Sequence, residues 1–210
     1  MDKRFAIFDM DGTLVDSMVF WKNLAPEYLS SKGIAHLPED ILERIKPMTM
    51  SESAALFKQE FGLTGDPEAE MNAMMDEHYR NDIPLKPGVW EYLDQLHSRG
   101  VRMCVASATA EHLMTACLRR LGVLDYFEFL LSCETVGVGK RAPIVYHESA
   151  RRLGAAPSDI AVYEDALYAL KTAKDAGYFV VGVYDDSAKS GWQAIANIAD
   201  ETFFSWEEAL

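Results

Sequence analysis

Short apolar runs alternate with segments of helical period along most of the chain. The first run, Phe5-Ala6-Ile7-Phe8, is bounded by charged residues, as expected of a strand buried on both faces of a parallel sheet. Later runs of the same kind cover residues 101–106, 129–131, 160–163, 179–183 and, more weakly, 202–204. Helical segments lie between them at 89–98, 110–121, 143–153 and 166–176, each followed within two residues by a glycine, a common helix stop. This alternation predicts an α/β fold with a doubly wound parallel sheet.

One stretch, from Ser17 to about Asn81, breaks the alternation and contains no convincing strand. Helical signals dominate it at residues 17–31, 38–46, 51–61 and 67–80, and Pro38 and Pro67 stand where the first turn of a helix accepts proline. We therefore predict a core made of residues 1–16 and 84–210 and an inserted α-helical cap domain of residues 17–83. Two connections join such an insertion to the sheet, an arrangement that suits a hinged lid.

Composition narrows the class of partner. The 210 residues are 49% apolar and 25% charged, which is ordinary for a globular protein. Lys and Arg number 20 against 33 Asp and Glu, so the net charge of −13 repels nucleic acids and anionic membranes. No apolar run approaches the ~18 residues of a membrane helix, and the first residues lack a signal sequence. We expect a cytoplasmic protein with neither a nucleic-acid nor a membrane partner, and buried free thiols at Cys104, Cys117 and Cys133.

The most informative segment follows the first predicted strand and begins Asp9-Met10-Asp11-Gly12. Side chains two apart on a strand point the same way, so Asp9 and Asp11 are expected roughly 6 to 7 Å apart at the carboxyl edge of the sheet, where α/β sheets bind ligands. Two carboxylates there are costly without a cation. A calcium loop is excluded, because glycine stands at loop position 4 rather than 6 and the twelfth position is Phe20 instead of glutamate.

Further polar residues follow later strands. Ser107 and Thr109 come after the second strand, Lys140 after the third, and the pair Glu164-Asp165 after the fourth. Singly, each has a plain structural interpretation: Ser107 and Asp165 as helix N-caps, and Lys140 as a surface charge. Together they place carboxylates, a hydroxyl and a lysine at the same edge of one sheet, which indicates a functional site.

These residues, in this order, resemble the haloacid dehalogenase (HAD) superfamily, and within it the phosphatases and β-phosphoglucomutase-like proteins that carry a helical cap. The resemblance covers essentially the whole chain and implies a Rossmann-like HAD core. It implies that Asp9 is the nucleophile, forming an aspartyl-phosphate, and that Asp11 is the general acid and base. It also implies that Ser107 and Lys140 hold the phosphoryl oxygens. Mg²⁺ would be held by Asp9, the backbone carbonyl of Asp11 and Asp165, with Glu164 beside it.

The chemistry agrees with this interpretation. Catalysis of phosphoryl transfer is mostly positioning and charge neutralisation, and Mg²⁺ prefers carboxylate and phosphate oxygens. A bound Mg²⁺ and Lys140 would let a protein of net charge −13 hold an anion. The expected function is therefore Mg²⁺-dependent hydrolysis of a small phosphorylated metabolite by a monomer or weak dimer.

Two alternatives to this function stay open, and departures from the family pattern raise the first of them. Arg141 stands where proline is usual after the motif lysine, Ala166 where serine is favoured, and Ala169 where glycine is favoured. A catalytically silent phosphate-binding protein of the same fold is one alternative, although the core charged residues are intact. A signalling receiver is disfavoured, since it would carry its phospho-acceptor on a later strand and no helical insertion.

The second alternative is a phosphosugar mutase. Proteins resembling β-phosphoglucomutase carry a histidine twelve residues after the nucleophile and an arginine in the next cap loop. Those positions are Trp21 and Met50 here, which favours hydrolysis over isomerisation. We take Trp21, Met48 and Met50 as candidate residues for substrate specificity.

Overall fold

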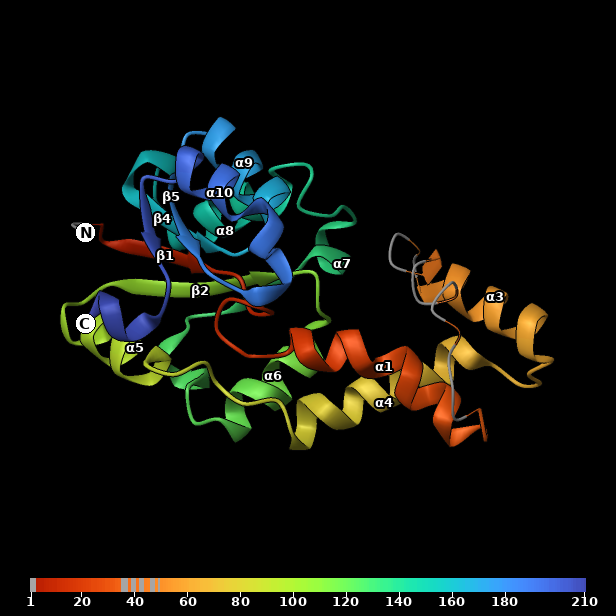
Figure 1. Ribbon diagram of the computed structural model, residues 1–210. Helices are drawn as coiled ribbons and strands as arrows, with labels where there is room; N and C mark the ends of the chain where they lie inside the picture. Colours follow the sequence, from red (N-terminus) through yellow and green to blue (C-terminus); the bar gives the residue numbers. More distant parts are fainter. Residues whose placement is uncertain (1–2, 35–37, 39–40, 42–43, 46–47, 49) are drawn as a thin grey trace. The chain divides into compact units, whose positions relative to one another are not determined.

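The computed structural model describes residues 3–34, 38, 41, 44–45, 48 and 50–210. Within them, strands β1 (Phe5–Phe8), β2 (Arg102–Ser107), β3 (Leu130–Ser132), β4 (Ile160–Glu164), β5 (Phe179–Val183) and β6 (Glu201–Phe203) form one sheet. All neighbouring strands are parallel, in the order β3-β2-β1-β4-β5-β6 (Figure 1). The predicted parallel sheet is confirmed, and the predicted strands match the observed ones to within a residue at either end.

Helices cover both faces of the sheet (Figure 1). On one face, α8 (Ile144–Leu153), α9 (Leu167–Asp175) and α10 (Trp192–Ile198) share a buried apolar cluster with the sheet. The other face carries α5 (Val89–Ser98) and α6 (Glu111–Arg120), with the 3-10 turn η4 (Trp206–Ala209) beside α5. The remaining short elements are α7 (Cys133–Val136), η1 (Leu124–Tyr126), η2 (Pro157–Asp159) and η3 (Asp186–Gly191). Helices on both faces make the sheet doubly wound, as predicted.

Helix α10 is the longest core helix that the sequence pattern does not predict. It spans seven residues and buries only Ile195, so it offers no repeating apolar stripe from which a helical period could be recognised. Ile195 nevertheless packs closely on β5, because a Cβ added to Gly182 would lie 2.5 Å from its Cγ2. Gly182 therefore lets α10 approach the sheet.

The chain divides into two compact units, residues 1–18 with 83–210, and residues 19–82. The second unit is helical and contains most of α1 (Met18–Ser31), then α3 (Met50–Phe61) and α4 (Pro67–Asn81). Its described core includes Tyr28, Phe57, Met71 and Met75, all nearly fully buried. The helix expected over residues 38–46 falls for the most part outside the described residues.

The two connections to the helical unit run side by side on the core. The backbone N–H of Asp16 donates to the carbonyl of Pro84 at 3.0 Å, and that of Lys86 donates to the carbonyl of Leu14 at 3.0 Å. An antiparallel bridge between Val15 and Leu85 lies between these bonds. The pairing fixes the core ends of both connections to each other.

Two composition-based expectations can be compared with the fold. All three cysteines are free and buried, as predicted. Burial raises the pKa of the Cys104 thiol well above its usual range and that of Cys117 to about 11, so both stay protonated and unreactive. No helix in the described part of the chain is long and apolar enough to cross a membrane.

Candidate active site

The segment after β1, residues 9–17, is held tightly at the carboxyl edge of the sheet, and we call it the β1 loop. The backbone N–H of Asp9 donates to the carbonyl of Tyr163 at 3.0 Å, which continues the pairing with β4. The carbonyl of Met10 then accepts from Leu14 at 2.8 Å. Gly12 has φ of +77°, and an added Cβ would lie 2.5 Å from Oδ2 of Asp165. Glycine is therefore required there for its backbone conformation and for space.

Three buried carboxylates meet at this edge. Asp9, Glu164 and Asp165 each offer an oxygen within 4.8 Å of the others, and none is more than 6% exposed. Asp9 comes from the β1 loop, Glu164 ends β4, and Asp165 follows it. Clustered carboxylate oxygens are the donors that Mg²⁺ prefers, so these residues fit that ion.

Lys140 is the cation in contact with this cluster. It lies on the loop between α7 and α8 and is 5% exposed, which excludes its interpretation as a surface charge. Its Nζ donates to Oδ1 of Asp9, and also to Oε1 of Glu164 at 2.5 Å. Burial opposes the charge, but the two carboxylates outweigh it and hold the pKa of Lys140 well above its usual range. The lysine is therefore charged.

One lysine does not balance three carboxylates. Burial raises the pKa of Asp9 well above its usual value, and the neighbouring carboxylates of Glu164, Asp165 and Asp11 add to this against the opposing effect of Lys140. Burial, with the charge of Glu164, likewise raises the pKa of Asp165 to about 7. The cluster is thus short of positive charge, which a divalent cation would supply.

Glu164 has both oxygens engaged. Oε1 accepts from Lys140 and from the hydroxyl of Tyr146 at 3.0 Å, while Oε2 accepts from the backbone N–H of Ala166 at 3.3 Å. Tyr146, on α8, is 1% exposed and was not among the sequence candidates. It stands within the apolar stripe of that helix, so the sequence indicates only a core residue.

The Asp11 carboxylate lies among hydroxyl groups and is not part of the cluster formed by the other three carboxylates. Its Oδ1 accepts from Ser17 at 2.7 Å, and its Oδ2 accepts from Thr109 at 2.6 Å and from Ser107 at 3.5 Å. The two aspartates that the sequence predicts side by side therefore have different partners. Asp9 faces a lysine and carboxylates, and Asp11 faces neutral donors. The sequence places Thr109 beside Ser107 at the end of β2, but it gives no sign that Thr109 contacts Asp11.

The plain N-cap interpretations do not hold for Ser107 and Asp165. The N-cap residues of α6 and α9 are Ala110 and Ala166, and neither helix has a side-chain cap. Ser107 instead accepts from the backbone N–H of Thr109 at 3.1 Å, and Asp165 accepts from the Thr13 hydroxyl at 3.2 Å.

Two of the three residues that depart from the family pattern, Arg141 and Ala169, fit their surroundings. The guanidinium of Arg141 lies 4.8 Å from the ring centroid of Tyr168, a cation–π contact. Ala169 is fully buried in α9. Its φ is not positive, so its backbone does not require the glycine that the family favours there. Neither change removes a charged group from the site.

The specificity candidates lie in or beside the helices of the second unit. Trp21 is 36% exposed on α1, and its indole N–H donates to the Tyr79 hydroxyl at 3.2 Å. Met50 begins α3, and Met50 and Met48 are both half-buried. Their part in substrate choice stays a prediction.

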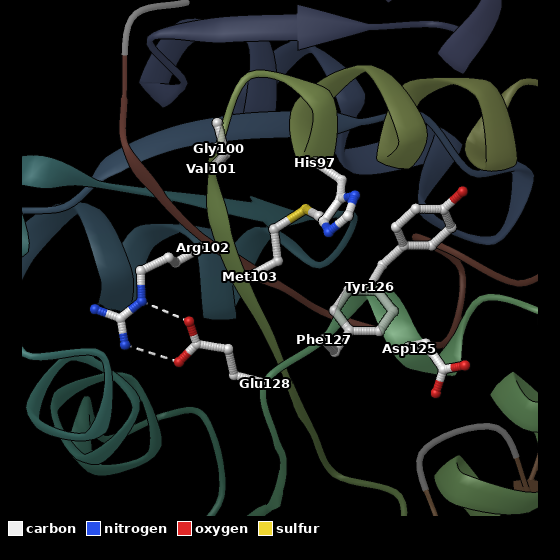
Figure 2. Close-up of a pocket in the computed structure, with 9 residues that line it drawn as sticks. All are labelled: His97, Gly100, Val101, Arg102, Met103, Asp125, Tyr126, Phe127 and Glu128. Carbon is white, nitrogen blue, oxygen red and sulfur yellow. Dashed lines mark hydrogen bonds and ion pairs between the residues drawn. The ribbon is translucent and has the colours of Figure 1, made fainter.

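A separate cavity of about 280 Å³ lies at the opposite edge of the sheet (Figure 2). Strand β2 begins at Arg102, which lines this cavity, and ends at Ser107 near Asp11. Figure 2 shows Arg102 paired with Glu128 through two contacts of 2.5 and 2.8 Å. The Arg102 guanidinium is thus paired with a carboxylate. The residues that line this cavity do not form a cluster like that of Lys140 with the three carboxylates.

Comparison with known proteins gives a consistent result. A family model described as haloacid dehalogenase-like hydrolase matches residues 4–177. The β-phosphoglucomutase of Bacillus subtilis (strain 168) is 28% identical over 196 residues, which cover 86% of this chain and 83% of that protein. The phosphorylated carbohydrates phosphatase of Thermotoga maritima is 28% identical over 174 residues, covering 81% and 80%. A HAD family hydrolase from Deinococcus radiodurans R1, solved with bound phosphate and sodium, has the same fold, with a TM-score of 0.75, 23% identity and coverage of 99% and 93%.

Proposed function

This chain belongs to the haloacid dehalogenase-like hydrolase family, and on that premise we propose that it is a Mg²⁺-dependent phosphatase that hydrolyses a small phosphorylated metabolite. The observation that carries the proposal is the buried cluster of Asp9, Glu164 and Asp165 in contact with Lys140. A sugar phosphate is the substrate class we favour, because both curated relatives named above act on phosphorylated carbohydrates by name.

In the first step an oxygen of Asp9 attacks the phosphorus of the monoester. A P–O bond to Asp9 forms, the P–O bond to the alcohol breaks, and Asp11 donates the proton that the departing oxygen takes up. The contacts of Asp11 with Ser17 at 2.7 Å and Thr109 at 2.6 Å support this role, since they fix the orientation of its carboxyl group.

In the second step a water oxygen attacks the phosphorus of the aspartyl-phosphate. Asp11 accepts the proton of this water, the P–O bond to Asp9 breaks, and inorganic phosphate leaves. Lys140 and Ser107 hold phosphoryl oxygens in both steps. The charged state of Lys140 supports this assignment.

Asp9, Asp165 and the backbone carbonyl of Asp11 would hold Mg²⁺, with Glu164 beside it. When bound, the ion supplies the positive charge that lets an anionic carboxylate approach an anionic phosphate. Both Glu164 oxygens already accept hydrogen bonds, from Lys140, Tyr146 and Ala166. This favours a position for Glu164 beside the ion over direct coordination.

The helical unit is proposed as the cap that selects the substrate. A phosphosugar mutase remains the second candidate, because a relative of 28% identity is a β-phosphoglucomutase. Hydrolysis is preferred, since Trp21 and Met50 stand where a mutase carries a histidine and an arginine.

The test is a screen of the purified protein with Mg²⁺ against sugar phosphates, nucleotides and phosphorylated acids, read as released phosphate. Asp9→Asn is the matched control, because an amide of equal size is a far poorer nucleophile. We expect it to keep the fold and to lose turnover by several orders of magnitude. Retention of more than about a tenth of the wild-type activity would exclude the aspartyl-phosphate mechanism.

A further inference from the structure

Trp206 lies directly behind the β1 loop, far along the chain from it. Its side chain is 1% exposed, and its indole N–H donates to the carbonyl of Thr13 at 3.0 Å. Trp206 begins η4 and falls outside residues 4–177, which the family model matches. The donor of this hydrogen bond therefore lies outside the matched segment, and its acceptor lies inside it.

Thr13 connects this contact to the carboxylate cluster. Its side-chain hydroxyl donates to Oδ1 of Asp165 at 3.2 Å, while its carbonyl accepts from Trp206. Thr13 is fully buried, and the preceding residue, Gly12, packs against the other oxygen of Asp165. A shift of the β1 loop at Thr13 would therefore move the Asp165 carboxylate.

The indole is held in place by an aromatic cluster. Its ring lies 4.9 Å from that of Tyr92 and 5.5 Å from that of Tyr163, measured between centroids. The hydroxyls of these two tyrosines lie 2.8 Å apart and are hydrogen-bonded to each other. On the next residue, the backbone nitrogen of Glu207 would lie 2.8 Å from a Cβ added to Gly88. This packing leaves the indole little freedom, so its N–H is a fixed donor.

We propose that Trp206 is a positioning residue of the active site: its N–H fixes the β1 loop at the Thr13 carbonyl and so orients Asp165 for Mg²⁺. The inference rests on the proposed function, in which Asp165 is a metal ligand. A buried carbonyl that loses its donor must move or stay unpaired. Partners that orient a metal ligand commonly change metal affinity about 10- to 100-fold when removed.

The experiment compares Mg²⁺ binding to wild type and to Trp206→Phe by isothermal titration calorimetry, without substrate. Phe keeps an aromatic ring and removes the N–H. Because Trp206 acts one residue further away than a direct partner of the ligand, we expect the Kd for Mg²⁺ to rise roughly three- to tenfold. Trp192→Phe is the matched control, since Trp192 packs with Tyr184 and Phe204, and its Kd should equal that of wild type.

A second variant separates the hydrogen bond from ring packing and covers the case in which Trp206→Phe fails to fold. Incorporation of 3-benzothienylalanine at position 206 keeps the bicyclic ring and replaces the N–H with sulfur. It should raise the Kd as Trp206→Phe does. A wild-type Kd in the benzothienyl protein would overturn the proposal, even if its unfolding temperature is lower, because the indole would then serve packing alone.

The failure of the proposed function would give a different result. If Asp165→Ala binds Mg²⁺ as wild type does, the metal assignment itself is wrong. If Asp165→Ala loses binding while the benzothienyl protein keeps it, only the role of Trp206 is wrong.

Discussion

The Tyr146 hydroxyl and the Lys140 ammonium share one acceptor, Oε1 of Glu164, at 3.0 and 2.5 Å. All three side chains are buried, and Lys140 contacts Asp9 as well. The Tyr146 hydroxyl therefore helps to orient Glu164, which in turn accepts from Lys140. The tyrosine hydroxyl is the most remote member of this series and the one that can be removed without changing a charge.

Tyr146→Phe should lower both stability and turnover. A hydrogen bond to a buried charged group is worth about 1.5–3 kcal/mol, so we expect a loss of unfolding free energy of that order and a fall in kcat of roughly tenfold. Denaturant unfolding and steady-state kinetics at saturating Mg²⁺ measure the two effects. Tyr178→Phe is the control, because Tyr178 is also buried but bonds to His147 at 3.1 Å. Equal kcat values for the two variants would contradict this prediction.

Mg²⁺ binding should weaken as the pH falls. In the metal-free protein the pKa of Asp165 is about 7, so below that pH the ion must displace a proton from it. For this one proton we expect the apparent Kd to rise by up to about tenfold per pH unit as the pH falls below 7. Calorimetric titrations at pH 6, 7 and 8 measure this. Identical Kd values at pH 6 and 8 would show that Asp165 carries no such proton.

The same shift predicts how stability depends on pH. The folded-state pKa of Asp165 lies above its usual value of 3.8, so the fold favours the protonated form. Its contribution is fully present below pH ~4 and is lost as the pH rises through about 7. Mg²⁺ should therefore raise the unfolding temperature more at pH 8 than at pH 6, and Asp165→Ala should abolish this difference.

A second pH effect is expected within the helical unit. His78 on α4 lies 2.8 Å from Asp82 and 3.2 Å from Glu27 on α1. Burial opposes its charge, but the two carboxylates outweigh burial and raise the pKa of His78 above 6.5. Its stabilising effect is fully present below pH ~6.5 and is lost as the pH rises through the higher folded value.

Comparison with His78→Gln isolates this effect. The difference in unfolding temperature between wild type and variant should shrink between pH 6 and pH 8.5. A difference that stays constant over this range would mean that His78 does not titrate there. Phe20, whose ring centroid lies 4.9 Å from the imidazole, also loses an aromatic contact in this variant. That loss does not depend on pH, so it does not affect the comparison between pH values.

The protein should hydrolyse phosphate esters and not isomerise hexose phosphates. A mutase must keep water from the aspartyl-phosphate until a second sugar hydroxyl attacks, which requires cap groups that Trp21 and Met50 cannot provide. Phosphorus NMR of β-glucose 1-phosphate with a catalytic bisphosphate distinguishes the reactions. Free phosphate should accumulate; faster accumulation of glucose 6-phosphate would establish the mutase instead.

The sequence predicts the sheet well because the central strands are apolar on both faces and the long core helices repeat their apolar positions. It does not reveal α10, which buries only Ile195. The order of the strands also lies beyond the pattern of apolar runs, since it is set by the crossovers between them.

For the site, the rule that parallel strands end at one edge was enough to group Asp9, Lys140, Glu164 and Asp165. This rule could not predict that Asp11 and Asp9 have different partners. The difference depends on the loop conformations that bring the Ser17 and Thr109 hydroxyls to Asp11. Tyr146 and Trp206 were missed for a different reason. Both are aromatic residues of the core, and only the position of one polar atom in each connects them to the site.

The position of β1 in the sheet also has a consequence for how the protein is made. Phe5 on β1 pairs with Arg102 on one side and with Ile160 on the other. At ~5–20 residues per second, this strand waits on the order of 10 s on the ribosome for its second neighbour. Until β2 is made both edges of β1 lack their final partners, and from then until β4 is made one edge still does. Unpaired strand edges of this kind favour aggregation of nascent chains. Chaperones that shield the unpaired edges of β1 during synthesis should therefore raise the yield of folded protein.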